Sequence, residues 1–207
     1  MIRTFNALLM IARAESGQAR DNMDDFDAAE VAHGIQELYE PLAEDSGLTL
    51  DVKTEPAPLH GNRELISQAL ANLVENAIKY GQPQPAAQPL GADAVSGRGA
   101  GKERAKDILI EAKRERDRIL LSVTDRGPGI PQADRKHATE RFVRLEASRS
   151  QPGSGLGLSL ASAVATLHGG DLRLSDAQPG LRATLALPAA VGEGLAAQMA
   201  NMQHKTA

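Results

Sequence analysis

The sequence predicts an α+β protein, a two-layer α/β sandwich in which helices cover one face of a mixed sheet. Segments with helical apolar spacing alternate with short strand-like segments over the first 80 residues. Strand-like segments that favour antiparallel pairing follow, with one more helical segment among them. Aromatic residues make up only 2% of the 207-residue chain, so the core between the two layers has to be aliphatic.

Composition excludes several classes of function. The formal net charge of −4 gives no electrostatic reason to expect a nucleic-acid partner. The chain has no Cys, which excludes disulfides and cysteine metal sites and fits a reducing compartment. No apolar run approaches the roughly 20 residues that cross a bilayer, and the first residues lack a signal-peptide pattern. We therefore expect a cytoplasmic chain with neither nucleic-acid nor membrane contacts of its own.

The first segment, residues 1–17, is predicted to be a helix because Ile2, Phe5 and Leu9 recur at helical spacing. A helix this short is marginal alone and needs a partner. Two interpretations stay open: an ordinary core helix, or the last turns of a longer hairpin helix that dimerises. A polar linker follows at residues 18–25.

Strands and helices then alternate up to residue 80. Short strands are expected at residues 25–28, 48–52 and 59–61, and helices at residues 28–45 and 63–80. Pro41 is a candidate kink in the first helix, and Asn62 is a suitable N-cap for the second. The predicted buried face of the second helix consists of Ile66, Ala69, Leu70, Leu73, Val74 and Ala77.

Residues 82–105 interrupt this pattern. They are poor in hydrophobic residues and rich in Pro, Gly and Ala, which favours a flexible surface insertion. Strands are expected after it at residues 107–112, 118–125, 171–175 and 182–187, with a short helical piece at 133–142, a helix at 156–168 and a tail at 191–207. The charged residues 115–117 are predicted to be a hairpin turn.

The helix at residues 63–80 carries the first candidate site. Asn72, Asn76 and Lys79 share one face of it, opposite the aliphatic face. A carboxamide oxygen suits Mg²⁺, which normally also takes phosphate oxygens and waters, and a Lys ammonium suits the phosphates. The alternative is a solvated helix surface with no ligand.

Asp125 is the second candidate, because it follows a strand and precedes Gly127 and Gly129. An ionised carboxylate accepts a hydrogen bond from the six-amino group of adenine, whereas guanine presents a carbonyl there. An unpaired buried polar group costs roughly 1–3 kcal/mol, enough to discriminate between the bases. The glycines allow the backbone to approach a base or sugar closely. The alternative is a plain Asp-Gly turn.

The third candidate is the glycine run Gly153, Gly155 and Gly157 before an apolar helix. Backbone amides at a helix start can cradle phosphate. The spacing differs from the dinucleotide fingerprint. Residues 97–102 do not form a P-loop, since the first glycine is misplaced and Glu103 stands where Ser or Thr is required.

Taken together and in order, these segments resemble the ATP-binding catalytic domain of sensor histidine kinases, in the superfamily that includes DNA gyrase, the large heat-shock chaperone and mismatch-repair ATPases. Residues 72–80 resemble its N box, 125–130 its first glycine box, 140–144 its F box, 153–158 its second glycine box and 180–184 its weaker last box. Thr139 stands where an aromatic is often found, and the insertion at 82–105 departs from the usual short connection.

The resemblance implies a Bergerat-type ATP-binding fold over residues 21–190, with an ATP lid at about 131–155. Asn76 would coordinate Mg²⁺ with support from Asn72, Lys79 and Tyr80 would contact phosphate or the nucleotide body, and Asp125 would read adenine. Asn72, Asn76 and Lys79 would be the catalytic set. The other ATP-binding residues would be Gly127, Gly129, Ile130, Arg144, Arg149, Gly153, Ser154, Gly155, Leu156, Gly157, Leu158 and Thr184, with Arg144 or Arg149 reaching the phosphates.

The lid is expected to be disordered or variable without ATP. Ordering each residue costs roughly 1–2 kcal/mol, whereas millimolar to micromolar binding provides only about 4–8 kcal/mol. Nucleotide contacts alone therefore cannot order some twenty residues.

In this family the γ-phosphate passes to a histidine on a preceding dimerisation hairpin, set in a His-Glu/Asp-Leu-Arg-Thr-Pro-like motif. None of His33, His60, His137, His168 and His204 has that context. Residues 1–20 do resemble the end of the second hairpin helix, so we expect the acceptor to lie upstream of Met1. The expected partners are that hairpin and a response regulator. The full-length kinase could carry an inner-membrane anchor.

Two other functions stay open from the sequence. The chain can be a non-catalytic ATP-binding module that regulates a partner. It can also be another ATPase or a serine-directed kinase of the same superfamily, although the helix at residues 1–17 and the absence of a transducer domain argue against this.

Overall fold

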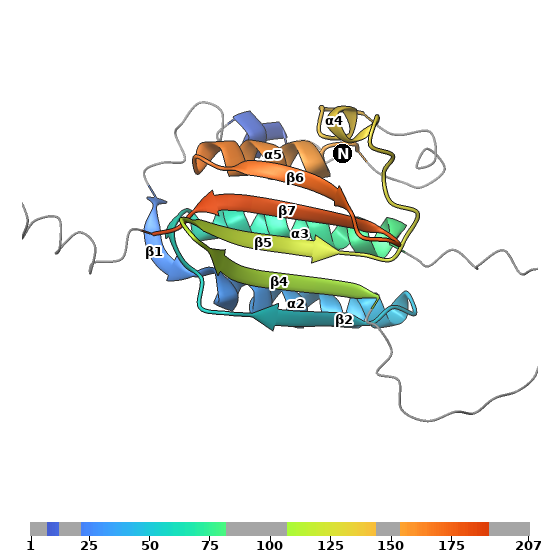
Figure 1. Ribbon diagram of the computed structural model, residues 1–207, viewed down its shortest axis with the longest axis horizontal. Coiled ribbons are helices and arrows are strands. Elements are labelled where there is room, and N and C mark those ends of the chain that lie inside the picture. Colours follow the sequence, from blue (N-terminus) through green and yellow to red (C-terminus); the bar gives the residue numbers. More distant parts are fainter. Residues whose placement is uncertain (1–7, 13–21, 82–106, 144–153, 191–207) are drawn as a thin grey trace, which may run out of the picture.

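A five-stranded mixed sheet forms one layer of the protein (Figure 1). The computed structural model describes residues 8–12, 22–81, 107–143 and 154–190. In order across the sheet, the strands are β2 (Leu50–Thr54), β4 (Ile108–Glu115), β5 (Arg118–Thr124), β7 (Leu181–Pro188) and β6 (Asp171–Asp176). β2 runs parallel to β4, and all other neighbours are antiparallel, so the sheet is mixed as predicted.

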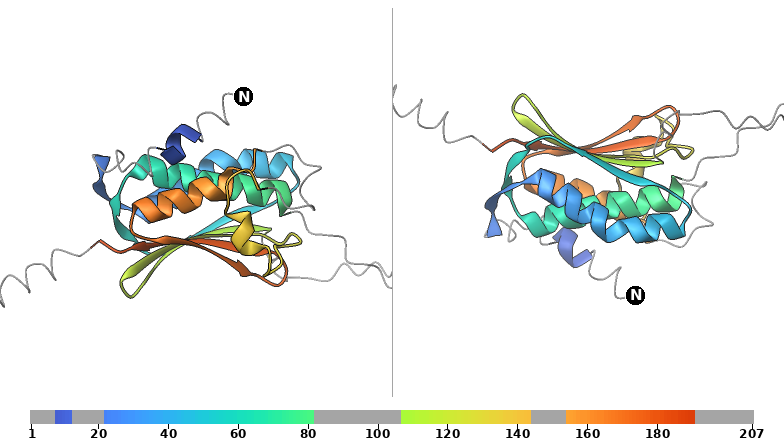
Figure 2. Two further views of the ribbon diagram at one scale, coloured as in Figure 1. Left: turned by 90° about the horizontal axis from the view of Figure 1, so that it is seen from above. Right: turned by 90° about the horizontal axis from the view of Figure 1, so that it is seen from below.

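Helices form the second layer and pack against one face of the sheet (Figure 2). They are α2 (Ala28–Asp45), α3 (Arg63–Tyr80) and α5 (Gly157–Leu167). A single-turn helix, α4 (Arg135–Ala138), lies in the loop-rich connection between β5 and α5. This arrangement confirms the predicted two-layer α+β sandwich.

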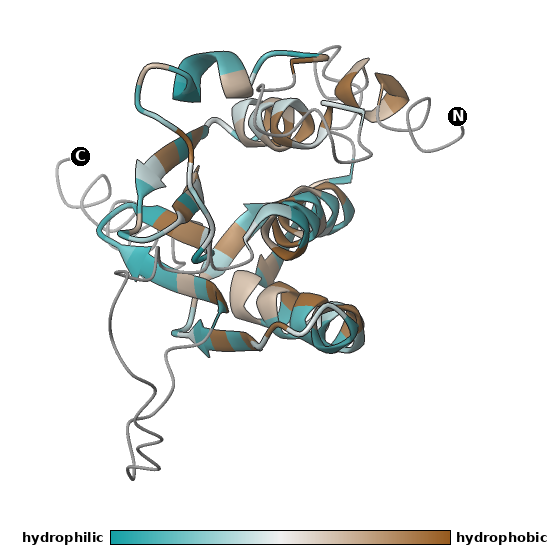
Figure 3. Ribbon diagram, turned by 90° about the vertical axis from the view of Figure 1, so that its right-hand side faces the viewer, coloured by the Kyte–Doolittle hydropathy of each residue, from teal (hydrophilic) through white to brown (hydrophobic). Residues whose placement is uncertain are grey.

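The core between the layers is aliphatic, as the composition requires. Ile119, Leu121 and Val123 of β5 are buried, and the residues between them face the other side of the sheet. All six apolar residues predicted for the inner face of α3 are buried. Figure 3, which looks along the strands and helices, shows hydrophobic and hydrophilic residues alternating in both layers.

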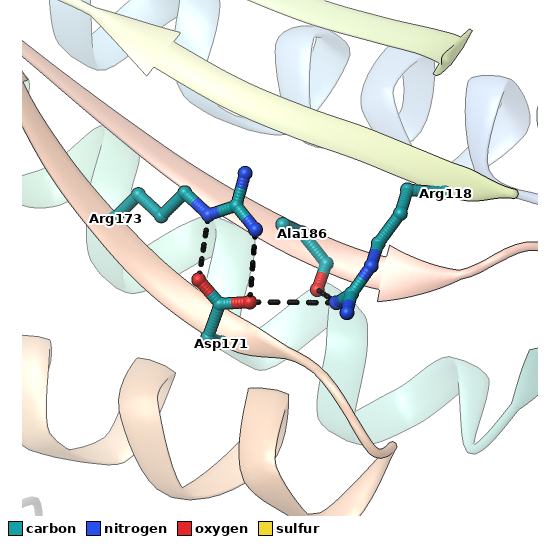
Figure 4. A network of polar contacts seen from close by, with 4 residues as sticks. All are labelled: Arg118, Asp171, Arg173 and Ala186. Carbon is teal, nitrogen blue, oxygen red and sulfur yellow. Dashed lines mark hydrogen bonds and ion pairs between the residues drawn. The ribbon is translucent and has the colours of Figure 1, made fainter. Parts of the chain in front are cut away.

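The sheet face without helices is polar in the described part of the chain. Asp171 of β6 accepts hydrogen bonds from Arg173, at 2.6 Å to Nε, and from Arg118 of β5, at 3.4 Å (Figure 4). The hydrogen bond from Arg173 lowers the pKa of the Asp171 carboxyl. Arg182 of β7 donates to Glu111 and to Ser122. These cross-strand pairs suit a solvated surface, so the helix-covered face is the one that builds the core.

A second, two-stranded sheet pairs β1 (Asp24–Asp27) with β3 (Pro58–Gly61), and this pairing was not predicted. Asp27 is the last residue of β1 and also the N-cap of α2. Its Oδ1 accepts from Ala29 N at 2.9 Å and from Ala57 N at 3.0 Å. One carboxylate thus ties the start of α2 to the chain that leads into β3.

Several predicted bounds change in the structure. Pro41 does not interrupt α2, which runs unbroken to Asp45. The helical piece predicted at 133–142 is reduced to α4, whose N-cap Asp134 makes no side-chain capping bond. β4 continues to Glu115, so the hairpin turn is confined to Arg116 and Asp117, with Arg116 at a φ of 58°.

Only part of the predicted N-terminal helix is described. Residues 8–12 are helical, and Ile11 joins the hydrophobic core with 1% of its surface exposed. The insertion at 82–105 and the tail at 191–207 lie outside the described residues. Within the described ranges, no helix has the length and apolarity that a bilayer crossing requires.

Candidate functional site

Helix α3 organises the candidate site because it carries polar residues on the side away from its aliphatic face. Asn62 caps its start, with Oδ1 accepting from Leu65 N at 3.0 Å. Asn72 and Asn76 are half-buried. The Nδ2 of Asn72 donates to Gln68 O at 2.8 Å. That bond turns the amide nitrogen of Asn72 toward its own helix and leaves its oxygen for other contacts.

The start of α5 lies directly against these two carboxamides. A Cβ added at Gly157 would lie 3.2 Å from Asn76 Nδ2 and 3.4 Å from Asn72 Oδ1. Gly157 is the first residue of α5, whose leading backbone N–H groups have no partner within the helix. The structure therefore brings the two predicted carboxamides together with Gly157, the last glycine of the predicted run.

Asp125 lies at the end of β5 and is only 9% exposed. Its Oδ1 accepts two backbone hydrogen bonds, from Gly127 N at 2.9 Å and from Leu181 N at 3.2 Å. Among the described residues, nothing donates a hydrogen bond to its Oδ2. Burial raises the pKa of the Asp125 carboxyl, and the two backbone donors offset part of that rise. The site therefore holds a buried acid with one oxygen fixed by the fold and one oxygen free for a ligand.

Close backbone contacts join Asp125 to the end of α3. A Cβ added at Gly81, which follows α3, would lie 2.7 Å from Asp125 Cβ. One added at Gly127 would lie 2.3 Å from Tyr80 O. Helix α3 therefore contacts Gly157 at its middle and the Asp125 loop at its end, so one element spans both halves of the site.

The far side of the Asp125 loop packs on the turn before β7. A Cβ added at Gly129 would lie 2.9 Å from Gly180 O, and Gly129 has a φ of 69°. Asp125 N donates to Leu181 O at 2.9 Å. The glycines of the first glycine box thus permit contacts that no other residue would allow.

The two described ends of the predicted lid meet at its base. Phe142 N donates to Gly155 O at 3.1 Å. Arg135 Nε donates to Ile130 O at 2.9 Å and fixes α4 to the first glycine box. His137 pairs with Glu140 at 3.0 Å on an exposed surface. Ser154 lies at the end of the predicted lid, Leu156 directly precedes α5 and Leu158 lies in it, and Leu156 is fully buried.

The remaining predicted residues fall into two groups. Lys79 and Tyr80 are half-buried at the end of α3, with Lys79 Nζ 5.1 Å from the centroid of the Tyr80 ring. This cation–π contact keeps the ammonium at that end of the helix. Arg144, Arg149 and Gly153 lie outside the described residues.

The predicted ATP contact of Thr184 does not fit the structure. It lies in β7 between Ala183 and Leu185, which are both buried on the helix side, so its own side chain belongs to the opposite face of the sheet. Its cross-strand partners there are Ser122 and Arg173. The structure therefore does not bring Thr184 to Asp125.

Sequence reasoning also missed two residues that contact Asp125. Leu181 supplies a backbone donor to Oδ1, and Gly81 allows the close approach of α3. For Thr184, the period-two alternation of apolar residues in its strand was a usable signal. The contribution of Leu181 is a backbone N–H, which carries no sequence signal at all.

Comparisons with known proteins agree with this geometry. The family model for the histidine kinase-, DNA gyrase B-, and HSP90-like ATPase matches residues 61–191. Sensor protein IrlS of Burkholderia pseudomallei is 29% identical over 184 residues, which are 88% of this chain and 35% of IrlS. The signal transduction histidine-protein kinase/phosphatase MprB of Mycolicibacterium vanbaalenii is 36% identical over 134 residues, which are 64% of this chain and 23% of MprB.

Among solved structures, a mycobacterial sensor histidine kinase MprB matches with a TM-score of 0.59 at 26% identity, covering 81% of this chain and 97% of that one. The chain spans only 35% and 23% of the two curated relatives named above. The family model covers more than half of the chain and includes α3, the Asp125 loop, α5 and β7. The chain therefore belongs to the family of histidine kinase-, DNA gyrase B- and HSP90-like ATPases.

Proposed function

We propose that this domain binds Mg-ATP between α3, the Asp125 loop and the start of α5, and transfers the γ-phosphate to a histidine outside this chain. The observation that carries the proposal is the double contact of α3. Its middle, at Asn72 and Asn76, meets the glycine start of α5, and its end meets a buried acid with a free oxygen. A triphosphate nucleotide has a charged end and a base end that match these two places.

The base end is read by Asp125. Its Oδ1 is already occupied by Gly127 N and Leu181 N, so the carboxylate cannot rotate without losing both hydrogen bonds. Its Oδ2 accepts from the six-amino group of adenine. Guanine would place a carbonyl oxygen against the same acceptor, so the site rejects guanine by leaving a buried charge unpaired.

The phosphate end meets Asn72, Asn76 and Gly157. The carboxamide oxygens are neutral hard ligands, which fit Mg²⁺ when phosphate oxygens supply the negative charge. Asn76 would hold the ion and Asn72 would support it, and a bound Mg²⁺ would neutralise charge that develops on the phosphates. Gly157 leaves room for phosphate oxygens beside the backbone N–H groups at the start of α5.

Catalysis at this site would consist mostly of positioning the reacting groups. In-line phosphoryl transfer needs the attacking and leaving atoms aligned and the charge on the phosphate neutralised. The residues of this chain hold the base and the phosphates, and Lys79 adds a cation near the end of α3. The imidazole nitrogen that attacks would come from a dimerisation hairpin, and a response regulator would then receive the phosphoryl group.

The test combines calorimetric titration with transfer in trans. We expect ATP to bind in Mg²⁺ about 5- to 150-fold more tightly than GTP, from the cost of roughly 1–3 kcal/mol for an unpaired buried group. Asn76→Ala should weaken binding only when Mg²⁺ is present, and Asp125→Asn should reduce the preference for ATP over GTP. Gln68→Ala is the matched control, because Gln68 is exposed on the same helix one turn before Asn72.

Transfer is then measured by adding an isolated phosphoacceptor hairpin and following acid-labile, base-stable phosphate. Phosphate on the hairpin supports the kinase. Binding without transfer would instead identify a non-catalytic regulatory module, and equal affinity for ATP and GTP would remove Asp125 as the reader of the base.

A further inference from the structure

Gly81 has no backbone reason to be glycine. It is the C-cap of α3, and a glycine near a helix C-terminus commonly adopts a left-handed conformation at the next position, C′. Its φ of −84° and ψ of 8° are instead open to any residue. The reason for a glycine here therefore has to be the space around it.

That space is filled by atoms that cannot move easily. A Cβ at Gly81 would lie 2.3 Å from Ala77 O and 2.7 Å from Asp125 Cβ. The first is a backbone atom of α3, which is held by the 2.7 Å hydrogen bond from Gly81 N to that same oxygen. Ala77 and Ile78 are buried in the core, so the end of the helix cannot retreat without disturbing it.

The displacement would therefore fall on Asp125. This residue is also confined from the other side, since a Cβ at Gly180 would come within 1.9 Å of Asp125 O. A Cβ at position 81 would displace Asp125 and lengthen the hydrogen bonds that Gly127 N and Leu181 N donate to its Oδ1. The free Oδ2 would then point in a different direction.

We propose that Gly81 is a positioning residue, which sets the distance between the end of α3 and Asp125 and thereby the selectivity of the site for a purine with a six-amino group. This inference rests on the proposed role of Asp125. Gly81 itself touches no ligand, and it acts only through the direction of Asp125 Oδ2.

The experiment compares the affinity for ATP with the affinity for purine riboside triphosphate, which lacks the six-amino group. Wild-type protein should prefer ATP by about 5- to 150-fold, from the cost of leaving a buried acceptor unpaired. Gly81→Ala should bring the ratio of the two dissociation constants close to one. Gly34→Ala is the matched control, because nothing lies within 4 Å of a Cβ at Gly34 in α2, and it should keep the wild-type ratio.

The Asp125→Asn background separates positioning from general damage. If Gly81 acts through the carboxylate, adding Gly81→Ala to Asp125→Asn should leave the already reduced ratio unchanged. A structural role alone would instead weaken the binding of both nucleotides equally and preserve the ratio, which would overturn the inference. Failure of Gly81→Ala to fold would also overturn it, because the glycine would then serve the fold.

The outcomes also distinguish this inference from the proposed function. Wild-type protein that binds both nucleotides equally would show that Asp125 does not read the amino group, so the proposed function would fail first. Wild-type discrimination that persists in Gly81→Ala would remove only the role of Gly81.

Discussion

The carboxyl group of Asp125 is buried, and the fold does not need it in its charged form. Its Oδ1 accepts backbone hydrogen bonds from Gly127 and Leu181, and an amide oxygen would accept the same two bonds. Burial raises the pKa of the carboxyl above its ordinary value, which means that the folded state holds the charged form unfavourably. The proposed contact with adenine would account for a charged group at this buried position.

Asp125→Asn should therefore lose ligand selectivity without losing stability. Because the folded pKa is raised, the wild-type carboxyl favours folding most at low pH, and this contribution is lost as the pH rises through the folded pKa. At pH 7 we expect the variant without nucleotide to have a melting temperature equal to or above that of wild type. The difference should shrink as the pH falls toward 4.

Thermal unfolding of both proteins from pH 4 to pH 8, without nucleotide, measures this difference. A variant that is clearly less stable than wild type at pH 7 would mean that the charge itself supports the fold. Asp134→Asn is a suitable control, since Asp134 makes no side-chain capping bond at α4.

At the residue scale, the candidate residues that the sequence supplied are polar side chains, and their roles in binding remain predictions. Asn72, Asn76 and Asp125 were identified from their chemistry and spacing, and the structure brings them to one helix and its end. Gly81 was not predicted as a contact of Asp125, because the two residues lie far apart in the chain. Contacts at that separation leave no local pattern.

At the scale of elements, the joining of α3 to α5 decides whether the site forms. The middle of α3 meets the start of α5 at Gly157, and the start of α3 is linked to the end of α5 by His168. His168 Nδ1 donates to Val164 O at 2.7 Å, and its Nε2 accepts from Asn62 N at 2.9 Å. The acceptor role of Nε2 requires the neutral ring, with its proton on Nδ1, where it is donated to Val164 O. One histidine thus closes the end of α5 and contacts the cap of α3.

Low pH should weaken the link that His168 makes between α3 and α5. Burial lowers the pKa of His168 below its ordinary value, and the nearby His60 lowers it further. The contribution of the neutral ring to stability is therefore present above the unfolded pKa of about 6.5, and it is lost as the pH falls through the folded pKa. Protonation would place a hydrogen on Nε2 against the Asn62 N–H.

Urea unfolding of wild type and His168→Gln between pH 5 and pH 8 tests this expectation. Wild type should be the more stable protein at pH 8, and the difference should narrow toward pH 5. His33→Gln, which changes an exposed histidine bonded to Thr54, should show little of this dependence. A constant difference between wild type and His168→Gln across the range would contradict the role of the neutral ring.

Elements with a strong apolar period were predicted closely, and those decided by tertiary contacts were not. Helices α2 and α3 matched their predicted bounds, because each combines a cap with a long apolar stripe. Helix α4 was predicted too long, since a short charged segment in a loop has no stripe to define its ends. The pairing of β1 with β3 was missed, because two four-residue strands far apart in sequence carry little pairing signal.

At the scale of the whole molecule, the site draws on both layers. Helices α3 and α5 provide one side of it, and the ends of β5 and β7 provide the other through Asp125 and Leu181. These elements share a single hydrophobic core. A ligand that bridges them cannot remain bound when the core unfolds, so binding and global unfolding have to be linked.

Mg-ATP should therefore raise the melting temperature of the whole domain. At a concentration about 100 times the dissociation constant, a ligand that binds only the folded state adds about 2.7 kcal/mol. For a protein of this size each kcal/mol corresponds to roughly 2–4 °C, so we expect a rise of about 5–11 °C. GTP at the same concentration should give a clearly smaller rise. Gly34→Ala should raise the starting melting temperature, through about 0.8–1 kcal/mol of helix propensity, and leave the ATP-dependent rise unchanged. A melting temperature that does not respond to saturating Mg-ATP would mean that the nucleotide does not bridge the two layers, and the site would then have to lie elsewhere.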